Sequence, residues 1–262
     1  MSDSIEAPPS WLAALEVRAV GELALLELAM PVRRLLPRGD GHHVVVLPGF
    51  TADDRSTQPL RRLLGDLGYQ AHGWGLGENL GPTPHILRGV RRLLDRVHAE
   101  GGAPVSIIGW SLGGIFAREL ARASPTMARQ VITLGSPIQM IEADRSSASS
   151  RYESLRHLHD PRRPRRQVRA AFLPPLEVPT TSVYSRTDGV VRWQASLIRR
   201  SDRSENIRVV GSHCGLGFNL SVVYAIADRL AQPADRWRPF VPPLLVRAWY
   251  PPADDLDPSR LP

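Results

Sequence analysis

Short apolar runs alternate with longer amphipathic stretches along most of the chain. Six apolar runs predict strands at 43–47, 69–74, 104–109, 130–134, 180–185 and 206–211. Four stretches between them predict helices at 57–67, 85–99, 112–123 and 217–231. Strands that alternate with helices are typical of a mostly parallel central sheet flanked by helices. The pattern therefore predicts an α/β fold, with a single domain over 41–231.

Apolar side chains in residues 11–30 recur at alternating steps of three and four, which predicts an amphipathic helix within an N-terminal segment at 1–40. These positions are Leu12, Leu15, Ala19, Leu23, Leu26 and Met30. Acidic residues lie between them, and Pro31 is expected to end the helix. We expect the helix to pack on the domain. Attachment to a membrane surface is the alternative, which the shortage of basic residues on its polar face disfavours.

Two segments depart from the alternation of strands and helices. Residues 138–179 carry clustered serines, then several prolines among many arginines. We interpret them as a cap or lid insertion, although a disordered segment fits the same composition. Residues 232–262 form a proline-rich C-terminal tail.

The composition of the chain limits the classes of binding partner and the cellular compartment that we expect. The chain carries 33 basic residues, all of them arginine, and a net charge of +7. These arginines are spread along the sequence without a nucleic-acid-binding signature, so we expect no nucleic-acid partner and at most weak association with a membrane surface. Cys214 is the single cysteine, and we expect it to be a small buried residue. No leader or membrane span is evident, which favours a cytoplasmic protein.

The segment around Ser111 carries the main candidate for chemistry. A buried run ends in Gly109, Trp110, Ser111, Leu112 and Gly113, and a predicted helix follows at once. In a tight turn between strand and helix, glycines at 109 and 113 would let the two elements approach and would expose the serine hydroxyl above the sheet. Ser111 is therefore the predicted nucleophile.

A serine nucleophile requires a base to take its proton and a carboxylate to orient that base. His213 follows the last apolar run and precedes the last long helix, so it is the predicted base. Asp188 follows the strand at 180–185 and is the predicted acid, although an Asp before Gly189 also suits a simple turn. We expect the other seven histidines to be structural or at the surface. Because no third ligand completes the pair His157 and His159, no metal is expected.

The same site needs donors for a developing oxyanion and a surface for the substrate. The loop after the strand at 43–47 offers the backbone N–H of Phe50, and the N–H of Leu112 follows the nucleophile at a helix N-terminus. Four aromatic residues are candidates for substrate binding: Trp74, Trp110, Phe116 and Phe218.

With these parts in this order, the sequence resembles a bacterial α/β-hydrolase of the serine esterase and lipase superfamily over about residues 43–231. The resemblance implies an α/β-hydrolase fold with a cap, nucleophile Ser111, acid Asp188, base His213, oxyanion donors Phe50 and Leu112, and no cofactor. It implies hydrolysis of a small-molecule ester or lipid substrate, with an apolar acyl chain expected from the aromatic residues. An acyltransferase or an amide or peptide hydrolase would use the same triad, and a non-catalytic binding protein on this fold is the remaining alternative.

Overall fold

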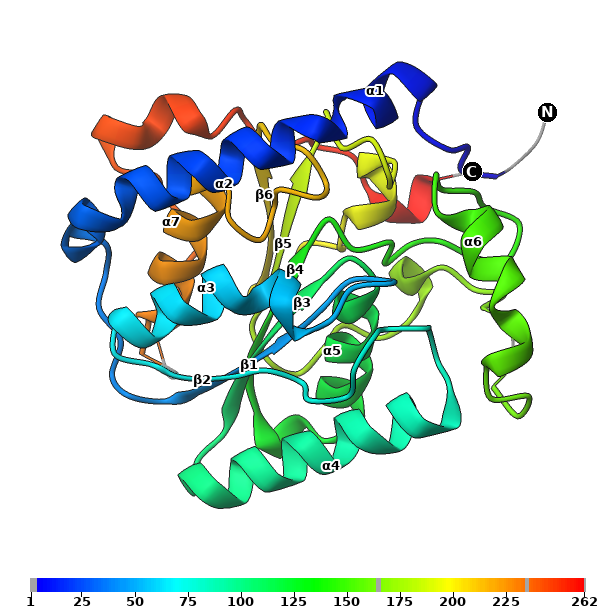
Figure 1. Ribbon diagram of the computed structural model, residues 1–262, viewed down its shortest axis with the longest axis horizontal. Coiled ribbons are helices and arrows are strands. Elements are labelled where there is room, and N and C mark those ends of the chain that lie inside the picture. Colours follow the sequence, from blue (N-terminus) through cyan, green and yellow to red (C-terminus); the bar gives the residue numbers. More distant parts are fainter. Residues whose placement is uncertain (1–3, 164–165, 234–235, 262) are drawn as a thin grey trace.

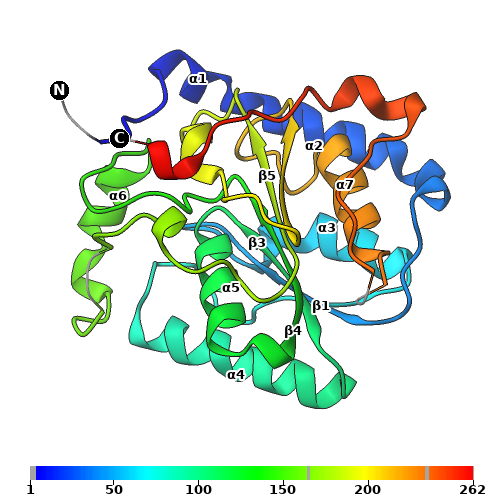
Figure 2. The same cartoon turned by 180° about the vertical axis from the view of Figure 1, so that it is seen from behind.

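A computed structural model describes residues 4–163, 166–233 and 236–261. Its centre is one sheet of six parallel strands (Figures 1 and 2). The strands are β1 (His43–Leu47), β2 (Gln70–His72), β3 (Val105–Trp110), β4 (Ala128–Leu134), β5 (Thr180–Ser185) and β6 (Ser204–Val209). Their order across the sheet is β2-β1-β3-β4-β5-β6. The predicted α/β class with a mostly parallel sheet is confirmed.

Helices cover both faces of the sheet, which explains why nearly every residue of its central strands β3 and β4 is buried. The helix α3 (Asp54–Asp66) and the helix α7 (Leu220–Leu230) pack on one face, in one core cluster. The helix α4 (Pro84–Gly101) and the helix α5 (Leu112–Ala123) pack on the other face, in a second cluster. Because all strands run the same way, their carboxyl ends meet at one edge of the sheet.

The element bounds follow local capping. The helix α3 begins three residues before the predicted 57, because the side chain of Asp53 accepts a hydrogen bond from the backbone N–H of Arg55. Thr83 caps α4 in the same way, and Gly102 ends it in the left-handed conformation that glycine adopts readily. The strand predicted at 69–74 is shorter, because the chain leaves the sheet after His72.

The N-terminal segment is helical and lies across the carboxyl-end side of β5 and β6 (Figure 1). It comprises α1 (Ser10–Ala14), η1 (Leu15–Val17), α2 (Arg18–Ala29) and η2 (Met30–Leu35). Leu12 and Leu26 are buried, as expected for a helix that packs on the domain. Its outward face is also apolar, with Val20 72% exposed and Leu28 78% exposed. The acidic residues of this segment were expected to face solvent, but two of them point toward the domain, as described below.

The segment 138–179 contains α6 (Ser149–Ser154) and the short helices η4 (Arg156–Leu158) and η5 (Ala170–Phe172). A buried ion pair joins its two halves, since Arg169 Nη1 lies 2.6 Å from Asp144 Oδ2. The second oxygen of Asp144 accepts the backbone N–H of Ile5 over 2.7 Å. Salt-bridged and hydrogen-bonded contacts thus hold the described part of this segment in one arrangement.

The remaining short helices are η3 (Pro125–Met127), η6 (Trp193–Ser196), η7 (Leu244–Trp249) and η8 (Pro258–Arg260). The last two belong to the tail, which packs along the domain: Tyr250 donates to the carbonyl of Ser221 over 2.6 Å, and Tyr184 donates to Asp254 over 2.8 Å. Within the described ranges, no helix is both long enough and apolar enough to cross a bilayer.

Candidate active site

Ser111 occupies a strained turn between β3 and α5. Its φ is 51°, a left-handed value that is uncommon for a residue with a side chain. The backbone N–H of Ser111 donates to the carbonyl of Leu134 over 2.8 Å, which fixes the turn to the end of the neighbouring strand β4. Such strain costs on the order of 1–3 kcal/mol and persists where surrounding contacts enforce it. The turn has the geometry that exposes a nucleophilic hydroxyl.

Glycines at 109 and 113 permit this turn, as predicted. A Cβ at Gly109 would lie 2.4 Å from the Cα of Gly114, and one at Gly113 would lie 2.4 Å from the carbonyl oxygen of Leu47. Both collisions are with backbone atoms, which cannot swing aside. Gly49 approaches from the loop after β1, where a Cβ would lie 3.3 Å from the Cβ of Ser111.

Asp188 and His213 lie together, on the loops that follow β5 and β6. His213 Nδ1 is 2.6 Å from Asp188 Oδ2, and both side chains are buried. The other carboxylate oxygen of Asp188 accepts the backbone N–H groups of Val190 and Val191, over 2.8 and 2.7 Å. The carboxylate is thereby locked in place, and its bond to Nδ1 leaves Nε2 of the imidazole for proton transfer.

The charge around His213 favours its protonated form. Burial lowers the pKa of the imidazole, but the Asp188 carboxylate and then Glu16 outweigh it, so the pKa of His213 lies above its usual value. A base with a raised pKa accepts a proton from a serine hydroxyl more readily.

The nucleophile turn and the base loop are connected directly. The indole Nε1 of Trp110 donates to the backbone carbonyl of His213 over 3.0 Å. A Cβ at Gly135 would lie 3.0 Å from both His213 Nδ1 and Asp188 Oδ2, so the residue after β4 lies against the acid and base pair. Leu134, whose carbonyl holds Ser111, is its neighbour. The structure thus brings Ser111, Asp188 and His213 to one edge of the sheet.

The N-terminal segment adds a carboxylate to this arrangement. Glu16 Oε1 accepts the backbone N–H groups of Gly189 and His213, over 2.8 and 2.9 Å. Its Oε2 accepts the N–H of Cys214 over 2.7 Å. Burial by itself would raise the pKa of Glu16. The three N–H donors together lower the pKa by more than burial raises it, so it lies below its usual value. One ionised side chain therefore joins the loop that carries Asp188 to the loop that carries His213.

Glu22 acts on the same loop from the next turns of helix. Its Oε1 accepts the N–H of Ser212 over 2.8 Å, and its Oε2 accepts the side-chain amide of Asn219 over 3.3 Å. A Cβ at Gly215 would lie 2.0 Å from Glu22 Oε2, so a larger residue at this position would displace the carboxylate.

The expected oxyanion donors lie on either side of Ser111. Leu112 is the first residue of α5, so its backbone N–H has no partner within the helix. Phe50 follows Gly49 in the loop that approaches Ser111. The buried side chain of Asn79 donates to the carbonyl of Pro48 over 2.9 Å, and the backbone carbonyl of Asn79 accepts the N–H of Thr51 over 2.8 Å. Asn79 thus holds the loop that carries Phe50.

A family model described as the alpha/beta hydrolase family matches residues 11–261. This chain belongs to the alpha/beta hydrolase family. No curated protein matches its sequence.

Solved structures with similar folds include other hydrolases. Lipase B from Aspergillus fumigatus aligns with a TM-score of 0.56 at 16% identity, over 73% of this chain and 52% of the lipase. A structure of the metagenome-derived lipolytic enzymes LipS and LipT aligns with 0.54 at 15% identity, over 74% and 93%. The pyrethroid hydrolase PytH aligns with 0.50 at 17% identity, over 75% and 100%. This alpha/beta hydrolase spans about half the length of the Aspergillus lipase, and at these identities the likeness is one of fold.

The four aromatic candidates for substrate binding divide into two groups. Trp74 is 2% exposed and Phe116 is equally buried, and both pack in the core cluster with α4, which leaves them no open face beside Ser111. Trp110 and Phe218 contact each other edge to face, with ring centroids 5.8 Å apart, next to the base loop. Beside them, the ring of Phe50 contacts Tyr152 of α6 at 5.4 Å.

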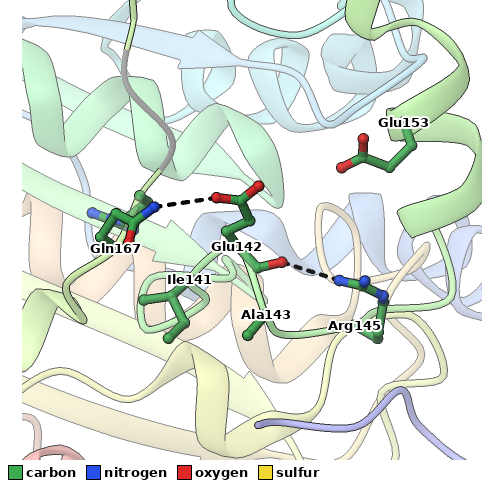
Figure 3. A pocket seen from close by; sticks show the side chains of 7 residues that line it. Ile141, Glu142, Ala143, Arg145, Glu153 and Gln167 are labelled. Carbon is green, nitrogen blue, oxygen red and sulfur yellow. Dashed lines mark hydrogen bonds between the residues drawn. The ribbon is translucent and has the colours of Figure 1, made fainter.

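A cavity of about 520 Å³ lies within the segment 138–179 of this alpha/beta hydrolase (Figure 3). Charged side chains dominate its lining, among them Glu142, Arg145, Glu153 and Arg166. Gln167 donates to Glu142 Oε2 over 3.3 Å at its wall. None of the residues predicted for the triad, the oxyanion donors or the substrate lines this cavity, and its charge does not suit an apolar acyl chain.

Sequence reasoning missed several residues of the site. Glu16, Glu22 and Asn79 carry no motif, and a glutamate between apolar positions of a helix is the usual pattern of a solvated face. A local signal exists only for Asn79, which lies among glycines in a loop. Cys214 is exposed rather than buried, because its backbone is held by Glu16 in a loop at the surface.

Proposed function

We propose that this alpha/beta hydrolase cleaves carboxylic esters through an acyl-enzyme on Ser111. The observation that carries the proposal is the buried pair of Asp188 and His213, 2.6 Å apart and bound through Trp110 to the strained turn of Ser111. Strain, base and carboxylate at one sheet edge match the requirements of nucleophilic catalysis by serine.

The chemistry follows from the roles of these groups. His213 Nε2 takes the proton of the Ser111 hydroxyl as its oxygen attacks the ester carbonyl. The N–H groups of Phe50 and Leu112 stabilise the oxyanion of the tetrahedral intermediate. The protonated imidazole then gives its proton to the leaving alcohol, and Asp188 stabilises the imidazolium without accepting the proton. Water, activated by the same base, cleaves the acyl-enzyme. No step requires a metal or an organic cofactor.

The proposed substrate is a small ester or lipid with an apolar acyl chain. Half-buried Phe50 and Leu112 lie beside the nucleophile, and Tyr152 of the insertion lies over Phe50. The structural neighbours are named as a lipase, lipolytic enzymes and a pyrethroid hydrolase, and a lipid or ester substrate agrees with the first two names. The segment 138–179 would act as the cap over the acyl chain.

The test is a chain-length series of p-nitrophenyl esters, run on the wild type, on Ser111→Ala and on Ser201→Ala as a control at an exposed serine. We expect Ser111→Ala to lose on the order of 10⁴-fold in kcat/KM, while Ser201→Ala keeps it. A fluorophosphonate should label the wild type and spare Ser111→Ala. Absence of Ser111-dependent hydrolysis at every chain length would overturn the proposal.

Acyl transfer and amide hydrolysis use the same intermediate. The two reactions are distinguished by the products that form from a p-nitrophenyl ester in the presence of a competing alcohol. Hydrolysis gives the free acid, and transfer gives a new ester. Predominant formation of the new ester would identify an acyltransferase, and cleavage of the matching anilide at a similar rate would identify an amidase.

A further inference from the structure

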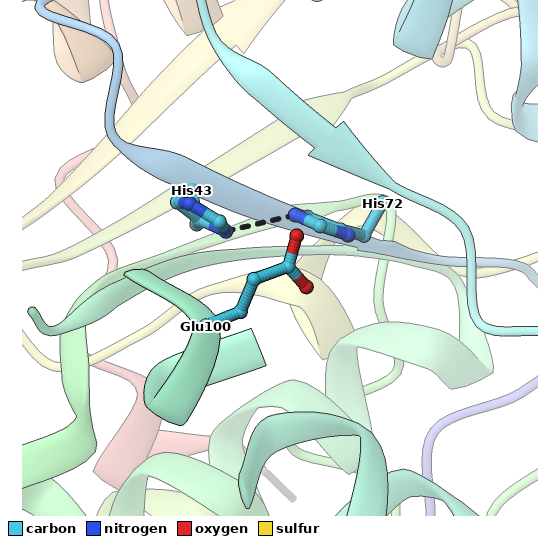
Figure 4. Close-up of side chains that lie close together, drawn as sticks. All are labelled: His43, His72 and Glu100. Atoms are coloured by element: carbon cyan, nitrogen blue, oxygen red, sulfur yellow. Dashed lines mark hydrogen bonds between the residues drawn. The ribbon is translucent and has the colours of Figure 1, made fainter. Parts of the chain in front are cut away.

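Three side chains with metal-binding atoms converge away from the triad, on the face of the sheet that α4 covers (Figure 4). His43 is the first residue of β1, His72 is the last residue of β2, and Glu100 lies in the last turn of α4. The parallel register pairs His43 with Gln70 and Val45 with His72, so the two histidines lie on adjacent strands, two register positions apart. Ser111 lies after the carboxyl end of β3, whereas His43 begins β1.

The geometry of this cluster is compact. His72 Nε2 lies 2.9 Å from His43 Nδ1, and the two rings stack with centroids 4.9 Å apart and planes 16° apart. One nitrogen from each imidazole and one carboxylate oxygen of Glu100 all lie within 4.8 Å of one another. Figure 4 shows the carboxylate directed at the two facing nitrogens. Each of the three atoms comes from a different element.

We propose that His43, His72 and Glu100 form a binding site for a zinc ion. Zinc binds imidazole nitrogens and carboxylate oxygens at about 2.0–2.2 Å, so its ligand atoms lie roughly 3.4 Å apart in a tetrahedral site. The two imidazole nitrogens need to separate by only about half an ångström from their 2.9 Å contact to reach this spacing. Glu100 is exposed and has the freedom to close the third side. Water would occupy the fourth position.

The charges around the three proposed ligands also bear on metal binding. Arg96 is the opposing charge, because its guanidinium lies 3.9 Å from Glu100 on the same exposed face of α4. Such an exposed pair is weak and screened by solvent, so a divalent ion competes with Arg96 for the carboxylate.

A bound zinc ion would connect the edge strand of the sheet more firmly to the rest of the domain. The strand β2 has three residues and pairs on one side only, with β1. A metal bound to His43, His72 and Glu100 would join β2 to β1 and to the end of α4. Because a ligand that binds the folded state alone stabilises it, zinc should raise the Tm of this hydrolase.

The experiment is calorimetric titration of the untagged full chain with zinc chloride, with Tm measured in parallel. The variants are His72→Gln, Glu100→Gln and, as a control on the same helix, His98→Gln, whose imidazole bonds to the carbonyl of Ala103. Glutamine at 72 keeps a polar group for His43. We expect the wild type and His98→Gln to bind about one equivalent of zinc and to gain Tm.

His72→Gln should weaken zinc binding by more than the roughly 10–100-fold that loss of an outer-shell partner costs. Arg96→Gln should bind zinc more tightly, because it frees Glu100 and removes a positive charge. Absence of saturable binding by the wild type, or equal affinities in the wild type and His72→Gln, would overturn the proposal. Ser111→Ala should bind zinc as the wild type does, so the result is independent of the esterase proposal.

Discussion

The indole N–H of Trp110 and the backbone carbonyl of His213 form a buried hydrogen bond of 3.0 Å across 103 residues of sequence. The residue before Ser111 therefore positions the loop of His213. A Cβ at Gly217 would lie 2.4 Å from the same indole ring, so the ring also fixes the course of the chain after His213.

Trp110→Phe tests this connection. Loss of the indole N–H leaves the His213 carbonyl without its donor, which should lower the free energy of unfolding by about 1–3 kcal/mol and reduce kcat through a less ordered base loop. Urea denaturation and steady-state kinetics measure the two effects. Tyr250→Phe is the matched control, since it loses a bond to the carbonyl of Ser221 but should keep kcat. Equal stability losses with kcat intact in both variants would contradict the positioning role.

Glu16 should be visible in the pH profile. Hydrolysis requires neutral His213, so kcat/KM should rise with pH through a midpoint above the ordinary 6.5 of histidine. The negative charge of Glu16 stabilises the imidazolium. Glu16→Gln removes that charge, so the midpoint should move to lower pH, on the order of one unit.

The control for Glu16 lies on the same segment. Glu27→Gln removes an exposed carboxylate of α2 and should leave the midpoint unchanged. Activity lost in Glu16→Gln with an unshifted midpoint would mean that Glu16 acts through the fold alone.

The close approach at Gly113 makes a prediction about stability. Gly113→Ala would place a methyl group 2.4 Å from the Leu47 carbonyl oxygen and 2.6 Å from that of Pro48. Overpacking against backbone should cost about 1–3 kcal/mol and displace the Ser111 turn, with loss of activity. Gly21→Ala, in α2 with open space around it, should instead gain about 0.5–1 kcal/mol. Thermal denaturation of both variants measures these changes in stability. A Gly113→Ala variant that is as stable as the wild type would refute the steric argument.

The ion pair of Asp144 and Arg169 should control the order of the segment 138–179. Asp144→Ala leaves a buried guanidinium without its main counter-charge, which should cost about 3–5 kcal/mol and open the segment to trypsin at its arginines. Asp160→Ala removes the partner of the exposed Arg162 and should leave the cleavage rate unchanged. Limited proteolysis followed by mass spectrometry compares the two. Similar cleavage patterns would mean that the pair does not hold the segment.

Periodicity predicted the architecture well because helices cover both faces of the sheet, so the apolar positions of each element pack in a core cluster. The strands at 43–47 and 180–185 and the helix at 112–123 have the predicted bounds, since each is bordered by glycine, proline or polar residues that end the apolar pattern. The family comparison confirms the alpha/beta hydrolase assignment. Ser111, Asp188 and His213 were predicted together because each follows a strand of the same parallel sheet, and the structure places all three at one edge of that sheet.

The residues that support the site, such as Glu16, could not be predicted from the sequence, because their contacts are long-range. Glu16 contacts Gly189 and His213, which lie 173 and 197 positions away, and no local pattern encodes a contact of that range. The exposed apolar positions Val20 and Leu28 were equally unexpected, because periodicity locates an apolar stripe without showing which face meets the domain. Trp74 was predicted from its residue type, but its burial was determined by packing against α4.

The span of the Glu16 contacts also sets the order in which the molecule is completed. A chain is synthesised from its N-terminal side, and long-range contacts form slowly because the intervening chain must first be ordered. The helix that carries Glu16 is made early, yet its hydrogen-bond donors at His213 and Cys214 are made 197 and 198 residues later. In the nascent protein, the loop of His213 therefore lacks its contact with Glu16 during most of synthesis, and this part of the candidate site is completed only when residue 16 meets residue 213.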